Sequence, residues 1–169
     1  MTALTALALV LLAMLVELQI SRRNERTLRA QGAAEPPDPA YGSMRWVYPG
    51  TFVAMTVESL LMARFDVRLL LAGAIVLLAA KVLKAWAIHS LGDRWTYRVF
   101  VLRGTPLVTR GPYRWLRHPN YVAVVGELVG FALLVAARLT GPASVLVFGG
   151  LLRQRIRSEE QALGLSRSS

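Results

Sequence analysis

Long apolar runs constrain the fold of this chain more than any other feature. Each run carries at most two charged residues, and the runs cover 2–20, 47–62, 69–88, 121–137 and 143–152. A helix of about 20 apolar residues crosses the hydrocarbon core of a bilayer. Period-two alternation long enough for a sheet is absent from the sequence. The pattern predicts an all-α integral membrane protein with about five transmembrane helices.

The first run is expected to be a membrane helix and not a signal peptide. No basic residue precedes it, and the charged pair Arg22 and Arg23 follows it. The segment 21–29 is expected to extend this helix along anionic headgroups. The prolines of 36–39 then break any helix, so 21–45 is predicted to be mainly a loop.

The last two apolar runs predict a helical hairpin. The run 143–152 covers only about half of the hydrocarbon core at 1.5 Å per residue. It is therefore predicted to continue as a helix to Leu163, with Gly164 as its stop. A turn at 138–142 would join the two helices and bring the charged end of the hairpin back to the polar segment 89–120.

The chain has a net charge of +10, and most of its cations lie between the apolar runs. Five arginines lie in 21–46, six in 89–120 and four after residue 152, against two in 64–68 and one in 138–141. Loops rich in arginine stay in the cytoplasm. The count predicts an external N-terminus and a cytoplasmic site in 89–120. This clustering favours membrane topology over nucleic-acid binding, so no nucleic-acid partner is expected.

Five charged residues lie inside the apolar runs. Glu17 is expected near the membrane interface, and Lys81 and Lys84 are expected to reach the headgroups from the far end of their helix. For Glu58 and Glu127, the sequence leaves open whether each is buried with a partner or lies near an interface.

The stretch 111–121 is the most polar sequence beside an apolar run. Pro119 suits the first turn of a helix, so His118 is expected directly before that helix. Free N–H groups at a helix N-terminus suit a carboxylate or a polar cofactor. Tyr113 and Trp115 add flat surfaces for an adenine or a sulfonium. For His118 alone, a purely structural role at the helix start stays open.

The second polar pattern is the pair Arg155 and Glu159, which share one face of a helix. Two interpretations stay open. The pair is either a solvated ion pair, or a site in which the arginine holds a carboxylate or phenolate and the glutamate takes ribose hydroxyls or an amino group. The chain has no cysteine, which excludes disulfides, thiolate catalysis and cysteine-ligated metals, and no metal site is predicted.

These two stretches together resemble the isoprenylcysteine carboxyl methyltransferase family. The resemblance is carried by Arg117–Tyr121, preceded by Gly111–Tyr113 and followed about 35 residues later by Arg155–Glu160. The stretches Leu107–Thr109 and Leu91–Trp95 are also similar to its cofactor-binding half.

The resemblance covers roughly 91–163 and implies a single membrane methyltransferase domain over 1–169. Within it, 1–90 would form three N-terminal transmembrane helices and 91–169 the cofactor-binding and catalytic half. The implied cofactor is S-adenosylmethionine, with S-adenosylhomocysteine as its product.

The family pattern also implies roles for individual residues. The cofactor site would be lined by Leu107, Val108, Tyr113, His118, Pro119, Asn120, Tyr121 and Glu159. Arg155 is implied to be the catalytic residue that faces the substrate and orients the methyl acceptor. Glu160 and Arg117 are further candidates, and the division of roles between Glu159 and Glu160 stays open.

The expected reaction is methyl transfer to a carboxylate, phenol or enol oxygen of a lipophilic acceptor. The acceptor would be lipid-modified, such as a prenylcysteine, or a small molecule, such as an alkylated pyrone, quinone or phenol. The usage of Arg, Ala and Leu suggests a bacterial source, which favours a small-molecule-type member in the inner membrane. Membrane lipids are the other expected contacts, and the sequence leaves the oligomeric state open.

Three alternatives stay in view. Membrane sterol reductases that use NADPH contain a stretch similar to Arg117–Tyr121, and phospholipid N-methyltransferases share the cofactor and the architecture. A non-enzymatic membrane scaffold is the third. The stretch Arg155–Glu160 favours methyl transfer over the reductase.

Overall fold

Five long helices make up most of the described chain, which in this computed structural model comprises residues 2–62, 66–102 and 104–162. The helices are α1 (Thr2–Ala30), α2 (Pro39–Met62), α3 (Val67–Leu91), α4 (Pro119–Leu134) and α5 (Thr140–Ala162), with short 3-10 turns η1 (Gly92–Arg94) and η2 (Gly111–Arg114). Strand-like pairing within these residues is confined to an isolated bridge between Ala34 and Val101. The all-α prediction is confirmed.

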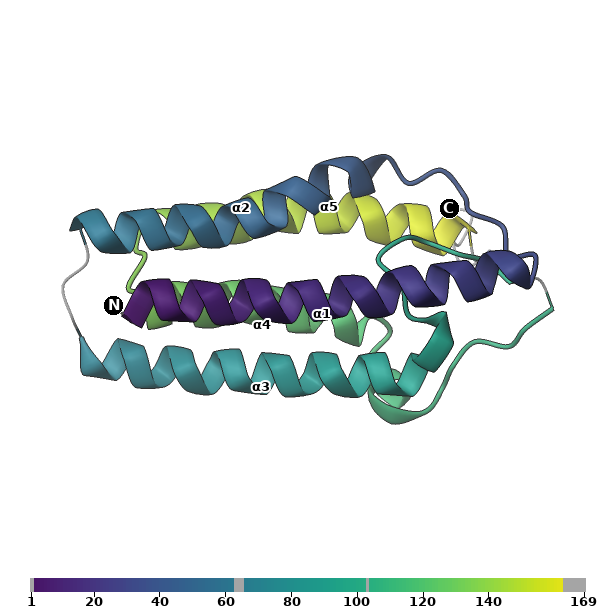
Figure 1. Cartoon of the computed structure of the whole chain (residues 1–169), viewed down its shortest axis with the longest axis horizontal. Helices are drawn as coiled ribbons and strands as arrows, with labels where there is room; N and C mark the ends of the chain where they lie inside the picture. Colours follow the sequence, from purple (N-terminus) through teal and green to yellow (C-terminus); the bar gives the residue numbers. More distant parts are fainter. Residues whose placement is uncertain (1, 63–65, 103, 163–169) are drawn as a thin grey trace.

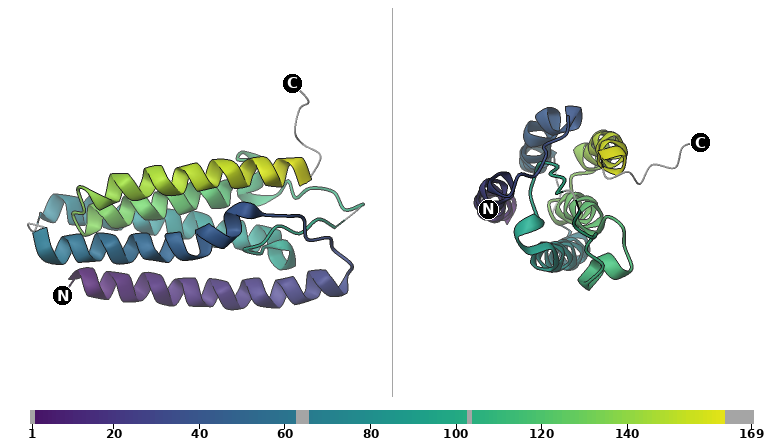
Figure 2. Two further views of the ribbon diagram at one scale, coloured as in Figure 1. Left: turned by 90° about the horizontal axis from the view of Figure 1, so that it is seen from above. Right: turned by 90° about the vertical axis from the view of Figure 1, so that its right-hand side faces the viewer.

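The helices lie side by side along one axis and alternate in direction (Figures 1 and 2). The segments 31–38 and 92–118 gather with the C-terminal part of α5 at one end of the bundle, here called the loop end. The start of α1 and the α4–α5 connection lie at the other end. The arginine count predicts the same arrangement, because it places the arginine-rich segments together on one side. Some residues of the predicted segments lie outside the described residues: Arg64 and Phe65 of the predicted turn, Arg103 of the polar segment, and Leu163 and Gly164 at the predicted end of the last helix.

Two helical stretches, Thr2–Ala30 and Val67–Arg94, are long and apolar enough to cross a membrane, and α4 is apolar but has 16 residues. Both long stretches expose large apolar side chains, such as Leu9 and Ile75, which are 63% and 69% accessible. Exposed apolar surface on this scale is typical of a face that contacts lipid or another protein.

Glycines bring α3 and α4 into close contact. A Cβ on Gly73 would lie 2.2 Å from the backbone N of Leu134, and a Cβ on Gly130 would lie 2.5 Å from the backbone N of Leu77. Neither site has room for any side chain. Close approach through small residues is typical of packed membrane helices, and it sets α4 firmly against α3.

The N-terminal helix extends beyond its apolar run and reaches Ala30 unbroken, as expected for a helical extension over 21–29. One face of this extension packs on protein. The amide of Asn24 donates to the carbonyl oxygens of Gly92 and Trp95 at 3.0 and 2.8 Å, and the Ser21 hydroxyl accepts from the backbone N–H of Tyr97 at 2.8 Å. These bonds tie the end of α1 to the 92–99 segment.

Two helix starts also lie earlier than predicted, because acidic side chains satisfy their free N–H groups. Asp38 accepts from the backbone N–H of Tyr41 at 3.1 Å, so α2 starts at Pro39, within the predicted loop. Glu58 accepts from the backbone N–H groups of Leu139 and Thr140 at 2.9 and 2.6 Å. Glu58 therefore caps α5, which settles its open role.

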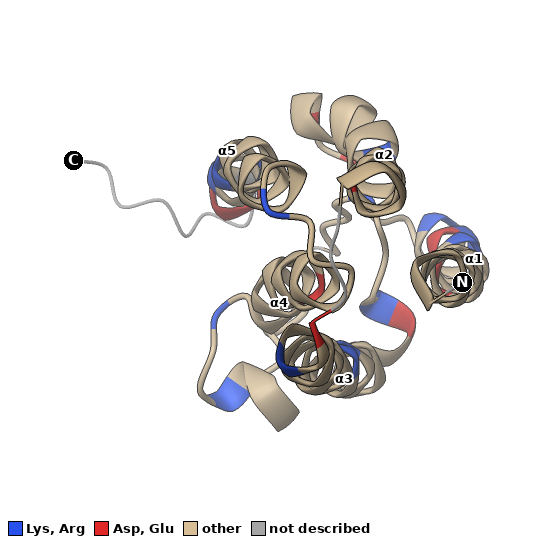
Figure 3. Ribbon diagram, turned by 90° about the vertical axis from the view of Figure 1, so that its left-hand side faces the viewer, with Lys and Arg blue, Asp and Glu red and all other residues tan. Residues whose placement is uncertain are grey.

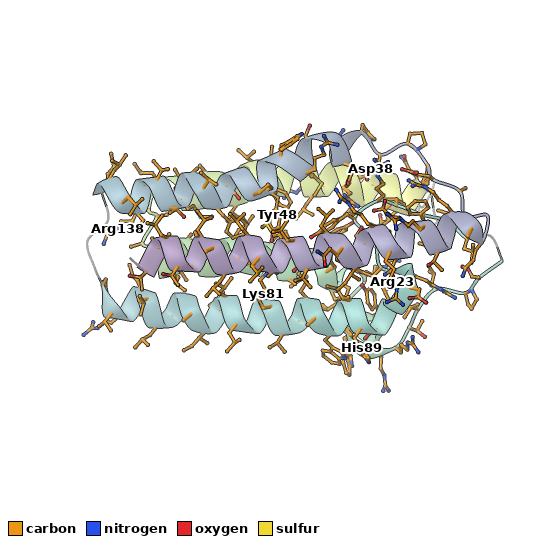
Figure 4. The ribbon with its side chains drawn as sticks, in the orientation of Figure 1. Arg23, Asp38, Tyr48, Lys81, His89 and Arg138 are labelled. Carbon is orange, nitrogen blue, oxygen red and sulfur yellow. The ribbon has the colours of Figure 1, made fainter. Side chains whose placement is uncertain are left out.

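A buried group of charges crosses the middle of the bundle. Lys84 is 2% exposed, and its Nζ lies 2.7 Å from Glu17 and 3.3 Å from Glu127. Lys81 lies 3.4 and 3.2 Å from the same two carboxylates, and the Tyr48 hydroxyl donates to Glu127. Figure 4 shows Tyr48 and Lys81 midway along the helices. The interfacial positions predicted for Glu17, Lys81 and Lys84 are therefore wrong, because burying each charge with a partner avoids leaving it unpaired.

Candidate functional site

The site is built where the start of α4 meets the end of α5, at the loop end. Pro119 occupies the first turn of α4, and His118 directly precedes it, as predicted. Pro119 is buried, and its ring needs no N–H partner at this position. The helix start is thereby fixed, and it presents Tyr121 toward α5.

Tyr121 is the central side chain of the site. Its hydroxyl donates to the Oε2 of Glu159 at 2.5 Å and accepts from the Nε of Arg155 at 3.1 Å. Arg155 and Glu159 thus bind the same hydroxyl. Arg155 is 7% exposed, so the interpretation of this residue as part of a solvated ion pair is wrong.

Arg155 points into the protein. Its Nη2 donates to the carbonyl oxygen of Tyr97, its Nη1 lies 3.6 Å from the Oδ2 of Asp38, and its guanidinium carbon lies 5.8 Å from the centre of the Tyr41 ring. The Asp38 Oδ2 is buried and has no hydrogen-bond partner, so its main interaction is with the Arg155 charge. Figure 4 labels Asp38 at the loop end, where α2 begins.

His118 and Glu160 form the outer edge of the site. The Nε2 of His118 lies 3.4 Å from the Oε1 of Glu160, and the Nη1 of Arg117 lies 3.8 Å from the same oxygen. The rings of His118 and Tyr121 stack at 5.4 Å with an angle of 17°. Arg117 and Glu160, the two further candidates, therefore lie beside the main group.

Asn120 faces the opposite way, into the structure. Its Oδ1 accepts from the indole N–H of Trp95 at 3.4 Å, and Trp95 is 2% exposed. Trp95 also packs on Tyr97 with ring centres 5.3 Å apart. Asn120 thus helps to hold the 92–99 segment, whose Tyr97 carbonyl binds Arg155.

Tyr113 reaches the site from η2. Burial, and then the negative charge of Glu159, raise the pKa of its phenol above the usual value. Gly111 has a φ of 61°, and a Cβ there would lie 2.0 Å from the Ser90 hydroxyl. This glycine lets η2 lie against the end of α3, and Tyr113 comes near enough to feel the charge of Glu159.

Leu107 and Val108 lie in a different place. They line an open pocket of about 310 Å³ formed by residues Leu91, Arg94, Pro106, Leu107, Val108, Thr109 and Arg110. None of the other predicted site residues lines this pocket. The structure thus gathers Tyr113, His118, Tyr121, Arg155 and Glu159 into one group, with Glu160 at its edge, and leaves Leu107 and Val108 apart from it.

Three residues of the site were missed by sequence reasoning: Asp38, Tyr41 and Tyr97. Asp38 and Tyr41 belong to a stretch that was predicted to be a loop because of its prolines. Tyr97 contributes only its backbone carbonyl oxygen, a group that every residue has. The one usable signal was Asp38 directly before Pro39, since this order is typical of a helix cap.

A family model and one named relative point to the same family. The model of the family described as "Isoprenylcysteine carboxyl methyltransferase (ICMT) family" matches residues 72–164. The chain is 32% identical over 157 residues to the uncharacterized protein YpbQ of Bacillus subtilis, covering 93% of this chain and 94% of that protein. It is 31% identical over 93 residues to the protein-S-isoprenylcysteine O-methyltransferase of Tribolium castaneum, covering 54% of this chain and 33% of that protein. No solved structure matches.

Proposed function

Because the chain belongs to the isoprenylcysteine carboxyl methyltransferase family, we propose that it transfers the methyl group of S-adenosylmethionine to an oxygen of a lipophilic acceptor. The observation that carries this proposal is the Tyr121 hydroxyl, which joins Glu159 and Arg155 at the loop end. The two motifs that carry the family resemblance meet at this one atom. The family match gives no support to the reductase or to phospholipid N-methylation.

The residues beside Tyr121 fit a cofactor that carries a sulfonium, an adenosine and an amino-acid group. Glu159 and Glu160 supply negative charge and hydrogen-bond acceptors, while Tyr113, His118 and Tyr121 supply aromatic faces, which attract a sulfonium. The positive end of the α4 dipole, at Pro119, adds an attraction for a carboxylate. These residues, with Pro119 and Asn120 as their support, would hold S-adenosylmethionine, which supplies an activated methyl group when bound. Leu107 and Val108 would join them if the 104–110 segment closes over the site.

Arg155 would stabilise the acceptor oxygen. A carboxylate acceptor is ionised at neutral pH and needs no base, whereas a phenol or enol gains acidity from a fixed positive charge nearby. Tyr121, the Tyr97 carbonyl and Asp38 hold the guanidinium in one orientation. A charge fixed in this way needs little reorganisation when the acceptor arrives.

The site would lie where the bilayer meets the cytoplasm. We propose that all five helices cross the bacterial inner membrane as one domain over 1–169, with the N-terminus outside and the loop end in the cytoplasm. The soluble cofactor would enter from the water, and the acceptor, either a prenylcysteine or an alkylated pyrone, quinone or phenol, from the lipid. The arginine distribution and the shared end of 31–38 and 92–118 support this orientation.

The test is methyl transfer in detergent or nanodiscs from S-adenosylmethionine labelled in the methyl group. Farnesylcysteine and an alkylated phenol represent the two acceptor classes. We expect label in the organic phase with at least one acceptor class, and loss of that label in Glu159→Gln. Transfer that is equal in the wild type and Glu159→Gln would contradict the site, and NADPH consumption without methyl transfer would contradict the function.

A further inference from the structure

One face of α1 is buried, although this helix lies at the outer edge of the bundle, beside α2 (Figure 3). Four residues of this face are spaced three or four positions apart and are at most 7% exposed: Glu17, Ser21, Asn24 and Leu28. The three polar ones each form a hydrogen bond with the 92–97 segment. Burying polar groups costs free energy unless they are paired, so this face of α1 is built to bind that segment.

Tyr97 is held by α1 at both its backbone and its side chain. Its backbone N–H donates to the Ser21 hydroxyl at 2.8 Å, and its phenol hydroxyl donates to the Oε2 of Glu17 at 2.9 Å. Two residues earlier, the carbonyl oxygen of Trp95 accepts from the Asn24 amide at 2.8 Å. With its ring and the backbone beside it both held, Tyr97 has little freedom to move its carbonyl oxygen.

The carbonyl oxygen of Tyr97 is the partner of Arg155, whose Nη2 donates to it. Because a hydrogen bond has a preferred distance and direction, a fixed acceptor also restrains its donor. The guanidinium on α5 and the buried face of α1 are thus joined through one residue. The helix α1 lies outside residues 72–164, the part of the chain that matches the family model.

The buried charges in the middle of the bundle hold Glu17 in turn. The Nζ of Lys84 lies 2.7 Å from the Oε2 of Glu17, the same oxygen that accepts from Tyr97. Lys81 lies 3.4 Å from its Oε1, and Glu127 pairs with both lysines. Charged residues inside membrane helices are costly, and they usually serve a function. Here the charges fix the carboxylate to which the Tyr97 hydroxyl is bound.

We propose that Glu17, Ser21 and Asn24 are positioning residues for methyl transfer, which act on Arg155 through the carbonyl oxygen of Tyr97. This inference rests on the proposed function and adds the first helix to the site. The held carbonyl oxygen keeps the guanidinium where the acceptor oxygen arrives. A displacement of about 1 Å at a reacting group can lower a rate about a hundredfold, so these side chains act on the rate of transfer and not on binding of the cofactor.

The test compares two matched variants of the full chain in nanodiscs. Tyr97→Phe removes the hydroxyl that donates to Glu17, and Tyr48→Phe removes the hydroxyl that donates to Glu127 in the same buried group. Both variants lose one bond of the same kind, but only Tyr97 also binds Arg155.

Transfer is measured with methyl-labelled S-adenosylmethionine, and with farnesylcysteine and an alkylated phenol as acceptors. We expect the kcat of Tyr97→Phe to fall about tenfold, while Tyr48→Phe keeps the wild-type kcat. The melting temperature and the affinity for S-adenosylhomocysteine should be similar in the two variants. A purely structural role of the buried group would affect both variants alike.

A second pair of variants separates the hydrogen bond from the charge. Glu17→Met with Lys84→Met removes one charge of each sign and leaves Lys81 paired with Glu127. Replacing a buried ion pair with apolar residues often leaves stability unchanged, so this variant should melt near the wild type but lose kcat as Tyr97→Phe does. Glu17→Gln with Lys84→Met keeps an amide oxygen for the Tyr97 hydroxyl and should restore most of kcat.

Three outcomes would overturn the inference: equal kcat in Tyr97→Phe and Tyr48→Phe, loss of kcat in Tyr97→Phe only through unfolding, or equal loss in the two double variants. Binding of S-adenosylhomocysteine and transfer by the wild type are measured in the same samples. If the wild type transfers methyl and any of these outcomes appears, the positioning role is wrong and the methyltransferase proposal stands. If the wild type transfers no methyl, the proposed function fails, and the positioning role fails with it.

Discussion

The hydroxyl of Tyr121 lies 2.5 Å from the Oε2 of Glu159 and donates a hydrogen bond to it. This bond joins the first turn of α4 to the last part of α5. Because the same hydroxyl accepts from Arg155, the position of the expected substrate-facing charge depends on a side chain assigned to the cofactor site. Binding of the cofactor and orientation of the acceptor are therefore expected to depend on each other through Tyr121.

Replacing Tyr121 with phenylalanine should weaken both functions at once. The change leaves Glu159 and Arg155 without their shared partner but keeps the ring that stacks on His118. Loss of a hydrogen bond to a charged group costs about 1.5–3 kcal/mol. We expect affinity for S-adenosylhomocysteine, measured by calorimetry, to fall by about tenfold to a hundredfold, and methyl transfer to fall further. A variant with unchanged affinity and rate would rule out the coupling.

Arg155→Ala should abolish methyl transfer and leave cofactor binding largely intact. It should also destabilise the protein, because it leaves the buried Asp38 carboxylate without its charge partner. Breaking a buried pair in this way costs roughly 3–5 kcal/mol.

The double variant Arg155→Ala with Asp38→Asn separates these two effects. Removing the second charge should restore most of the lost thermal stability in detergent, while transfer stays absent. Recovery of transfer in the double variant would show that Arg155 acts only by neutralising Asp38. Loss of cofactor binding in Arg155→Ala would move this residue out of the substrate role.

Because Lys84 is buried between Glu17 and Glu127, we expect the stability of the protein to depend strongly on it. Lys84→Met leaves Glu17 and Glu127 buried with only the more exposed Lys81, so we expect a loss of roughly 3–5 kcal/mol in unfolding free energy. Lys81→Met is the matched control and should cost less, because Lys81 is 25% exposed. Equal melting temperatures for the two variants would contradict the buried arrangement.

The helices and the start of the site could be predicted from the sequence. Five apolar runs, the last of them short, predicted the five helices. Pro119 marked the start of α4 because its chemistry suits only a few helix positions. The spacing of Arg155 and Glu159 placed both residues on one helix face. These are local features, which a sequence states directly.

The contacts of those side chains could not be predicted. Asp38 and Tyr97 meet Arg155 across 117 and 58 positions of the chain, and such pairs depend on how three segments pack. The prediction that Lys84 reaches the headgroups was wrong for the same reason. A lysine near a helix end extends to the interface unless a neighbouring helix offers a carboxylate partner. Glu17 and Glu127 do so only once α1, α3 and α4 are in register.

Membrane orientation can be tested with single cysteines, since the natural chain has none. Arg138→Cys lies in the α4–α5 connection and Thr105→Cys at the loop end, and both positions are exposed. We expect a membrane-impermeant thiol reagent applied to intact cells to label position 138 and not position 105. Labelling of both positions from outside, or of position 105 alone, would contradict the proposed orientation.

The most direct test of the central claim compares two ligands by calorimetry on the purified protein in detergent: S-adenosylhomocysteine and NADPH. The account predicts saturable binding of S-adenosylhomocysteine alone, and weaker binding in His118→Ala and Glu159→Ala. Binding of NADPH alone would favour a reductase, and binding of neither ligand would favour a scaffold. Either result would contradict the methyltransferase.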